Sequence, residues 1–405
     1  MYALAFKFYD RMHAVEGEMK KIILVCICMF FLASFCLYGQ TWSPPKRITW
    51  NSGSSSAPFI IVDSNNHLHV VWHDTSSGNK EIYYKKSTDG GAAWSVVKRL
   101  SWNGGNSYYP HIAVDSNNHV HVAWYDETPP NWVIMYKKST DGGATWTTLK
   151  WLTWTNGDLA SSNPTIAVDS NDILHLVWEE DNYPYFRDLM YKKSIDGGAT
   201  WSAKKRLTWN SGASTSPYLI VDSNDYLHVV WQDQAQTAGE YEVYYKNSQD
   251  GGMTWSAPIR LTWNADASWN PKIASGPGND VFVCWENSLS GLFEIFIVKS
   301  TDSGATWSAL KRLTWNIEQS RFPFAAVDSS SNPHIVWEQG TYNNFDIYYK
   351  QSFDGGGSWS MASRLTWTSL WTVNSVIAID SNDDLHLVWI SNITGNYELY
   401  YKNRK

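Results

Sequence analysis

The sequence predicts an all-β protein, a seven-bladed β-propeller of four-stranded antiparallel blades. Three observations predict it: an aromatic-rich composition, an internal repeat, and complementary chain ends. Of the 405 residues, 43% are hydrophobic, and 25 are Trp and 23 Tyr. Aromatic residues favour strands, and this apolar fraction is typical of a globular protein with a sizeable core. The formal net charge of −7 argues against the concentrated basic surface that nucleic-acid binding needs.

The repeat fills the chain from residue 41 to its end. One unit reads W-S-x-x-x-R-L-T-W-N, then P-x-I-A-V-D-S-N-x-x-L-H-V-V-W, then E-I-Y-Y-K-K-S-x-D-G-G-x-x-W. The Trp that ends R-L-T-W recurs with gaps of 52, 52, 55, 54, 52 and 52 residues, at Trp50, Trp102, Trp154, Trp209, Trp263, Trp315 and Trp367. Tandem units of about fifty residues are typical of propeller blades.

Each unit contains four short alternating runs, which in the second unit are Lys98–Ser101, Ile112–Asp115, Val120–Trp124 and Ile134–Lys138. Asp-Ser-Asn and Asp-Gly-Gly turns separate the runs, and period-2 alternation between such turns indicates hairpins. The runs therefore predict four strands in each blade.

The two ends of the repeat region complement each other. The chain stops at Tyr400–Asn403, the third strand of a seventh unit, and Thr41–Trp50 supplies the missing fourth strand. We expect the N-terminal strand to complete the last blade and close the ring, which removes an exposed edge. Residues 40–405 are then one domain.

Residues 1–39 are predicted to be an N-terminal extension and a secretory signal peptide. Lys20 and Lys21 precede the apolar run Ile22–Tyr38, and Gly39 follows it. A basic stretch, an apolar core and a small residue are the parts of such a signal. With cleavage after Gly39 the protein is secreted or extracytoplasmic. Without cleavage the same run would anchor the protein, and this segment alone would contact a membrane.

Six copies of Ser-x-Asp-x-Gly-x-x-Trp occur in phase with the repeat. Their aspartates are Asp89, Asp141, Asp196, Asp250, Asp302 and Asp354. With these boxes the chain resembles the Asp-box, or BNR-repeat, propellers of the sialidase superfamily. Asp can accept hydrogen bonds from its own turn, Gly supplies a positive φ, and Trp plugs the hairpin. We interpret the six boxes as structural, because chemistry needs one site and not six copies.

One strand position holds histidine in six blades, at His69, His121, His175, His228, His334 and His386. Zinc needs three or four converging ligands, whereas these side chains are spread around a ring. The sequence therefore predicts no metal site and no cofactor.

The ligand face is predicted opposite the Asp-box turns, where the loops after R-L-T-W and after the second-strand Trp diverge between repeats. Acids just beyond that Trp, such as Asp74 and Asp126, are expected to form an acidic rim. Aromatic faces beside polar groups suit sugars. The candidate ligand-binding residues are Arg187, Arg321, Trp132, Trp269, Trp371, Tyr109 and Phe322.

The resemblance implies three arginines that hold a substrate carboxylate, which this chain does not supply. Six arginines occupy the repeated outer-strand position, at Arg47, Arg99, Arg206, Arg260, Arg312 and Arg364. Only Arg187 and Arg321 remain for the ligand face. Glu179, Glu286 and Glu338 are candidate catalytic carboxylates, since two carboxylates ~5–10 Å apart suffice for glycoside hydrolysis.

Two functions therefore stay open. The first, which we prefer, is a non-catalytic exported propeller that binds an extracellular glycan or a surface protein. The alternative is a glycoside hydrolase, exo-sialidase-like, that acts on extracellular glycans through carboxylates at the mouth of the channel.

Overall fold

The computed structural model describes residues 41–127, 131–154, 160–182, 186–209, 212–234, 240–263, 266–289, 291–341, 344–368 and 370–405. The predicted signal segment lies outside these residues. Pro44–Asn403 is one compact unit, and Met1–Ser43 with Arg404–Lys405 is a second, in which Trp42 and Arg404 form an isolated β-bridge. The described residues include no helix long and apolar enough to span a bilayer.

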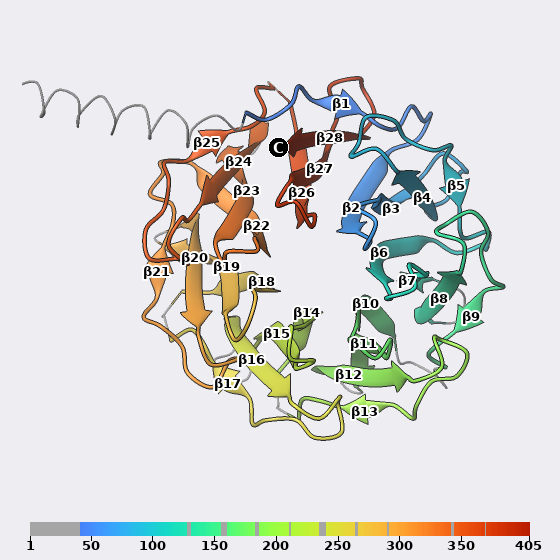
Figure 1. The fold of residues 1–405 in the computed structure, drawn as a ribbon, viewed down its shortest axis with the longest axis horizontal. Helices are drawn as coiled ribbons and strands as arrows, with labels where there is room; N and C mark the ends of the chain where they lie inside the picture. Colours follow the sequence, from blue (N-terminus) through green and yellow to red (C-terminus); the bar gives the residue numbers. More distant parts are fainter. Residues whose placement is uncertain are drawn as a thin grey trace, which may run out of the picture. The chain divides into compact units, whose positions relative to one another are not determined.

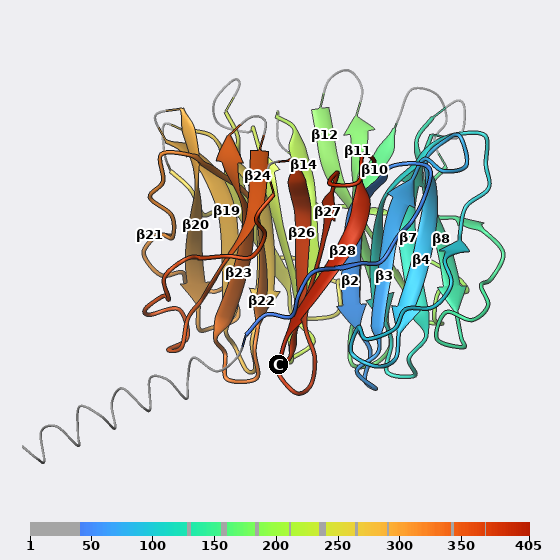
Figure 2. The ribbon, with the colours of Figure 1, turned by 90° about the horizontal axis from the view of Figure 1, so that it is seen from above.

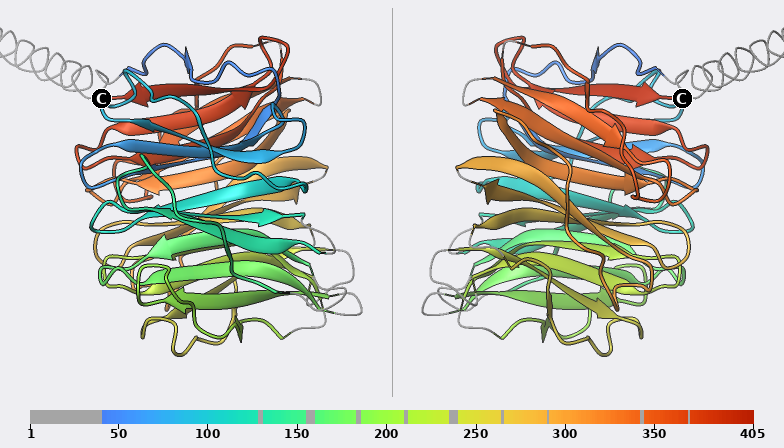
Figure 3. Two further views of the ribbon diagram at one scale, coloured as in Figure 1. Left: turned by 90° about the vertical axis from the view of Figure 1, so that its right-hand side faces the viewer. Right: turned by 90° about the vertical axis from the view of Figure 1, so that its left-hand side faces the viewer.

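The unit Pro44–Asn403 is a ring of seven four-stranded antiparallel sheets, as the repeat predicts. Figure 1 looks down the ring axis, and Figures 2 and 3 show the blades side by side around it. The innermost strands are β2 (Ser55–Val62), β6 (Ser107–Val114), β10 (Ser161–Val168), β14 (Ser214–Val221), β18 (Ser268–Ser275), β22 (Gln319–Val327) and β26 (Thr372–Ile379).

Three further strands follow outward in each blade. The second strands are β3 (Leu68–Asp74), β7 (Val120–Asp126), β11 (Leu174–Asn182), β15 (Leu227–Asp233), β19 (Val281–Leu289), β23 (Pro333–Thr341) and β27 (Leu385–Ser391). The third strands are β4 (Glu81–Ser87), β8 (Val133–Ser139), β12 (Phe186–Ser194), β16 (Glu242–Ser248), β20 (Leu292–Ser300), β24 (Asn344–Gln351) and β28 (Glu398–Arg404). The outer strands are β5 (Lys98–Arg99), β9 (Lys150–Trp151), β13 (Lys205–Arg206), β17 (Ile259–Arg260), β21 (Lys311–Arg312), β25 (Ser363–Arg364) and β1 (Lys46–Arg47).

The N-terminal strand completes the last blade. β1 pairs antiparallel with β28, Lys46 opposite Tyr401 and Arg47 opposite Tyr400. The predicted closure is confirmed, and it gives the last blade four strands like the other six.

The hydrophobic core lies between neighbouring blades. In one cluster Trp124 of the second blade packs with Val71 and Ile82 of the first. Each blade buries the Trp of its second strand to at least 98%. Large aromatic side chains supply much apolar area per residue, which is why this position is Trp in all seven blades.

The second-strand histidines have structural partners. His69 Nε2 lies 3.1 Å from Asp63 Oδ2, and its Nδ1 lies 2.8 Å from the hydroxyl of Tyr84. The same Asp–His–Tyr set recurs in five other blades. No group of three metal-ligating side chains is present among the described residues.

The Asp boxes are self-contained turns. Ser87 Oγ donates to Asp89 Oδ1 at 2.8 Å, and the amide of Ala93 donates to the same oxygen at 2.8 Å. In the third box, hydrogen bonds from the hydroxyl and amide of Thr200 lower the pKa of Asp196 to about 2. The carboxylates are therefore ionised hydrogen-bond acceptors of their own turns.

Candidate functional site

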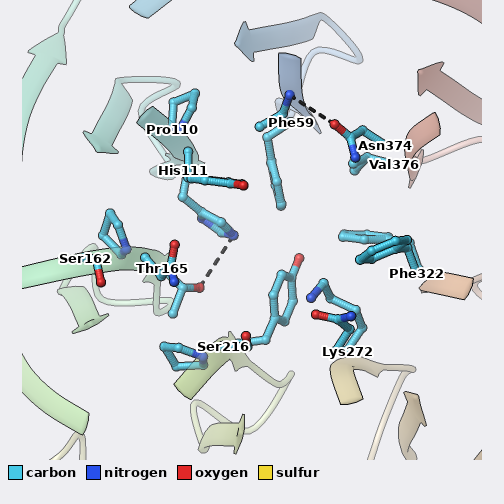
Figure 4. Close-up of a pocket in the computed structure, with 18 of the residues that line it drawn as sticks. Phe59, Pro110, His111, Ser162, Thr165, Ser216, Lys272, Phe322, Asn374 and Val376 are labelled. Carbon is cyan, nitrogen blue, oxygen red and sulfur yellow. Dashed lines mark hydrogen bonds between the residues drawn. The ribbon is translucent and has the colours of Figure 1, made fainter. Parts of the chain in front are cut away.

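A central pocket of about 580 Å³ lies on the ring axis and is lined from all seven innermost strands (Figure 4). Each innermost strand carries a β-bulge, for example between Ser56 and Phe59 in β2. The bulge residues have positive φ between 43° and 54°; they are Ala57, Tyr109, Asn163, Ser216, Asn270, Phe322 and Asn374. Because a bulge re-aims the chain locally, these seven residues form the mouth of the pocket.

Below the mouth, each blade contributes one side chain at the same strand position, two residues after the bulge residue. These side chains are Phe59, His111, Thr165, Tyr218, Lys272, Phe324 and Val376. They differ in size and charge although their backbones are equivalent. This layer gives the symmetric ring one asymmetric binding surface.

Four of these side chains form an aromatic cluster across the channel. The ring centroids of Phe59 and His111 are 4.0 Å apart, and those of Tyr218 and Phe324 are 5.7 Å apart. Phe59 also meets Phe324 at 5.9 Å, edge to face. Such pairs hold each other in place, so the aromatic side chains at the bottom of the pocket have fixed positions.

Lys272 is the cation of this layer. Its Nζ lies 5.2 Å from the centroid of the Tyr218 ring and donates to the carbonyl of Pro271 at 3.3 Å. Burial lowers the pKa of Lys272 to about 8, so the ammonium form predominates at neutral pH. Cys284 stands opposite Lys272 in the strand register, and burial raises the pKa of this thiol to about 12, so it stays neutral. Among the described residues, no carboxylate forms an ion pair with Lys272, and none lines the pocket.

His111 is neutral, and both of its ring nitrogens are engaged. Nδ1 accepts from the amide of Ile166 at 3.3 Å, and Nε2 lies 3.5 Å from Thr165 Oγ1. Burial lowers the pKa of His111 to about 3. A general base needs a free lone pair within reach of a substrate proton, and the lone pair of this imidazole is occupied by a backbone amide.

The three candidate catalytic glutamates lie beside the pocket rather than in its lining. Glu179, Glu286 and Glu338 are each at least 98% buried, and each accepts a hydrogen bond from a bulge amide of the next blade. The donors are the amide of Ser216 at 2.5 Å, that of Phe322 at 2.6 Å and that of Asn374 at 2.6 Å. Their role in this geometry is to fix the mouth; a catalytic role for them remains a prediction.

The candidate ligand-binding residues divide into two groups. Tyr109, Trp132, Arg187 and Phe322 line the pocket. Arg187 is held by Asp181 and Glu179, with N–O distances of 2.8 and 3.2 Å.

The other three candidates lie outside the lining. Trp269 packs on Tyr241 with ring centroids 5.0 Å apart, and Trp371 packs on Phe345 at 5.7 Å. Arg321 pairs with Glu286 at 3.3 Å and lies over the ring of Phe293. The structure therefore does not bring all seven candidates together.

The prediction of an acidic rim around the pocket is wrong. The acids after the second-strand Trp are almost all buried, at Asp74, Asp126, Glu179, Glu180, Asp233, Glu286 and Glu338. Asp74, for example, accepts from Ser55 Oγ at 2.7 Å and from Asn51 Nδ2 at 2.9 Å. These strands extend past the Trp, so the carboxylates bind turn and loop donors inside the blade instead of facing water.

Known proteins share this architecture. Residues 27–151 match the model of a BNR repeat-containing family member. The structure of a polysaccharide lyase, the PL25 ulvan lyase, superposes with a TM-score of 0.63 at 12% identity, over 88% of this chain and 95% of that one. A protein of unknown function from Dyadobacter fermentans gives a TM-score of 0.60 at 12% identity, over 91% and 99% of the two chains.

The NanB sialidase from Streptococcus pneumoniae gives a TM-score of 0.50 at 14% identity, over 89% of this chain and 70% of that one. The match to a BNR-repeat family thus covers residues 27–151, and the β-propeller fold is shared with a sialidase and a polysaccharide lyase. No curated protein matches its sequence. At these identities the likeness shows the fold alone.

The six outer-strand arginines of this propeller are not available to a substrate carboxylate. Each pairs with an acid at the start of the third strand, at N–O distances from 2.5 to 2.8 Å. Lys272, His111 and Tyr218, which do line the pocket, were not among the residues predicted from sequence. The sequence did contain a signal for these three residues. Each follows the Pro of a P-x-I-A-V segment, and this position changes most between otherwise similar repeats.

Proposed function

We propose that this propeller is an exported, non-catalytic carbohydrate-binding protein that holds an acidic sugar unit in its central pocket. One observation carries the proposal. The pocket combines aromatic walls with one ammonium group, that of Lys272, and the described lining contains no carboxylate. Sugar C–H faces stack on aromatic rings, and a charged donor holds a carboxylate or sulfate strongly.

The fixed mouth supports binding. Tyr109 and Phe322 are bulge residues from opposite sides of the ring, and Trp132 adds a third aromatic wall. Glu286 restrains the backbone of Phe322 through its amide. A pre-organised wall loses little conformational freedom when a ligand binds.

Among its described residues, the same pocket lacks the paired carboxylates with which a glycosidase hydrolyses its substrate. Paired hydrolytic carboxylates must face the glycosidic bond, and the buried glutamates are committed to bulge amides instead. His111 offers no free lone pair for proton abstraction. These contacts favour a binding role over the hydrolase alternative.

The test is native mass spectrometry of the protein, expressed from its full sequence, with a library of sialylated, uronate-containing and neutral glycans. We expect complexes with intact acidic glycans. Shortened glycans would identify a hydrolase, and products with an unsaturated uronate would identify a lyase; either would overturn the non-catalytic role. Binding of no glycan would leave a surface protein as the partner.

Lys272→Met tests the anchoring group. Because a charge-assisted hydrogen bond contributes about 1.5–3 kcal/mol, affinity for acidic glycans should fall roughly 10- to 100-fold and that for neutral glycans should not. Lys86→Met, on a third strand away from the pocket, is the matched control and should change neither. Equal affinity of wild type and Lys272→Met would show that the pocket does not bind through this ammonium.

A further inference from the structure

The seven tryptophans that end R-L-T-W, called here the rim tryptophans, are 63–75% exposed. Each follows the outer strand of a blade. Five lie at the seam with the next blade, with a lysine Nζ of that blade's third strand 4.7–5.8 Å from the ring centroid; they are Trp50, Trp102, Trp209, Trp315 and Trp367. Exposed apolar side chains are ordinary when scattered, but here the largest apolar side chain is exposed at the same place in every blade. The outer strands that precede them run around the whole circumference (Figure 1).

Basic groups accompany the rim tryptophans. At the first seam, Trp102 lies with Lys98, Arg99 and Lys137 in a groove whose other lining is Ala144–Thr148 of the second blade. Lys137 Nζ lies 4.7 Å from the centroid of Trp102. This lining contains no acidic side chain.

The charge of that seam is positive. Glu81 neutralises Arg99 at 2.6 Å. Lys98 donates to the carbonyl of Ala144, and in the described part of the chain neither Lys98 nor Lys137 forms an ion pair with a carboxylate. The groove therefore presents an open indole beside the half-buried ammonium group of Lys98, and the ammonium group of Lys137, which is 92% buried, lies over the indole ring.

The lysine pair recurs at four other seams, as Lys46 with Lys85, Lys150 with Lys192, Lys205 with Lys246, and Lys311 with Lys350. The seam of Trp263 has Ile259 and Val298 at these positions instead. Trp263 is 75% exposed and Arg260 lies 4.5 Å from its ring. The chain thus contains its own control, an equally exposed indole without the lysine pair.

We propose that the outer wall is a second, multivalent site for a linear polyanionic polysaccharide. Sugar rings stack on the rim tryptophans, and sulfate or carboxylate groups meet the lysine pairs. A flexible polymer can follow a circumference, whereas a flat bilayer meets only part of it. Several weak subsites acting on one polymer raise its affinity by avidity. The proposal is independent of the central pocket.

The test measures binding of the full chain to dextran sulfate, to unsulfated dextran of equal length and to polyglutamate, by calorimetry and tryptophan fluorescence. We expect dextran sulfate to bind at least 10-fold more tightly than either of the others, with an affinity that falls as salt rises. Equal binding of polyglutamate would reduce the site to charge alone and overturn the stacking. Equal binding of dextran would overturn the role of the lysines. Preference for anionic phospholipid vesicles over dextran sulfate would identify a membrane surface instead.

Single-seam variants locate the site. Trp102→Ala should weaken dextran sulfate binding about 3-fold, and Trp102→Ala with Trp209→Ala and Trp315→Ala at least 20-fold. Trp263→Ala is the matched control and should change it less than 1.5-fold. In a Lys272→Met background the tryptophan substitutions should have the same effects, which separates the wall from the central pocket. Equal effects of Trp102→Ala and Trp263→Ala, or a triple variant that binds like wild type, would overturn the proposal.

Discussion

Arg99 and Glu81 form an ion pair with an N–O distance of 2.6 Å in which the carboxylate is wholly buried and the guanidinium is 27% exposed. The hydroxyl of Ser101 donates to the other carboxylate oxygen. Six blades have this arrangement. The second blade has Val133 in place of the acid and Trp151 in place of the arginine; Val133 belongs to a hydrophobic cluster against which Trp151 packs. Acid and arginine are thus exchanged as a unit for an apolar pair.

This exchange predicts the behaviour of a swap in the first blade. Arg99→Trp alone should lower the free energy of unfolding by about 3 kcal/mol, because it leaves Glu81 buried without its partner. Glu81→Val with Arg99→Trp should recover most of that loss, since it copies the second blade. Chemical denaturation of the two variants measures both values. A double variant no more stable than Arg99→Trp would show that the two positions are not coupled.

Glu338 predicts a pH dependence of stability. Burial raises its pKa from an ordinary 4.5 to about 8. The folded state therefore binds this proton more tightly than the unfolded chain does. Between about pH 4.5 and 8 the free energy of unfolding should fall as pH rises, by up to about 1.4 kcal/mol per unit for one proton.

Glu338→Gln tests this slope. The amide oxygen can still accept from the Asn374 amide, which donates to Glu338 at 2.6 Å. The variant should show a smaller fall over this range than wild type and should be the more stable of the two above pH 8. Denaturation at several pH values measures the difference. Parallel curves would show that Glu338 is ionised in the fold throughout.

Two tryptophans of the third blade should differ in their effect on stability. Trp201, of the third Asp box, is half-buried and meets Tyr136 of the preceding blade edge to face, with centroids 5.5 Å apart. Trp201→Ala should cost about 3 kcal/mol, near the low end for a buried Trp. Trp209 is 67% exposed, and Trp209→Ala should cost less than about 1 kcal/mol. A loss under 1 kcal/mol for Trp201→Ala would contradict the structural role of the box.

The fold could be predicted from sequence because every blade repeats the same physical solution. The buried Trp recurs seven times, and the turn Asp and Gly of the Asp box six times, all with nearly fixed spacing, so the copies reinforce one interpretation. The closure followed from the chain ends alone, and the pairing of Lys46 with Tyr401 confirms it.

The site was harder to predict, because it depends on what each blade does differently. Divergent loops suggested the mouth aromatics Tyr109, Trp132 and Phe322, which do line the pocket. Lys272 was missed because it sits inside a strand that otherwise follows the repeat. The burial of Asp74 and its neighbours was missed for another reason. Tertiary contacts decide how far a second strand continues beyond its Trp, and this length decides whether the acids there are exposed to solvent.

The paired glycines of the Asp box should not be equivalent. Gly142 has φ of 64°, and a Cβ there would meet only the flexible end of Lys86, at 2.9 Å. Gly143 has φ of 91°, and a Cβ there would lie 2.0 Å from the hydroxyl of Tyr84, which bonds His69. Asn tolerates the left-handed region, so Gly142→Asn should cost less than about 1 kcal/mol.

Gly143→Asn should cost about 3 kcal/mol, because it adds backbone strain and displaces the Tyr84 ring from the contact between two blades. Chemical denaturation of the two variants compares them directly, with Gly142→Asn as the control for the substitution itself. Equal losses would mean that Tyr84 can move aside without cost, and that the Asp box of one blade does not brace the Tyr of the blade before it.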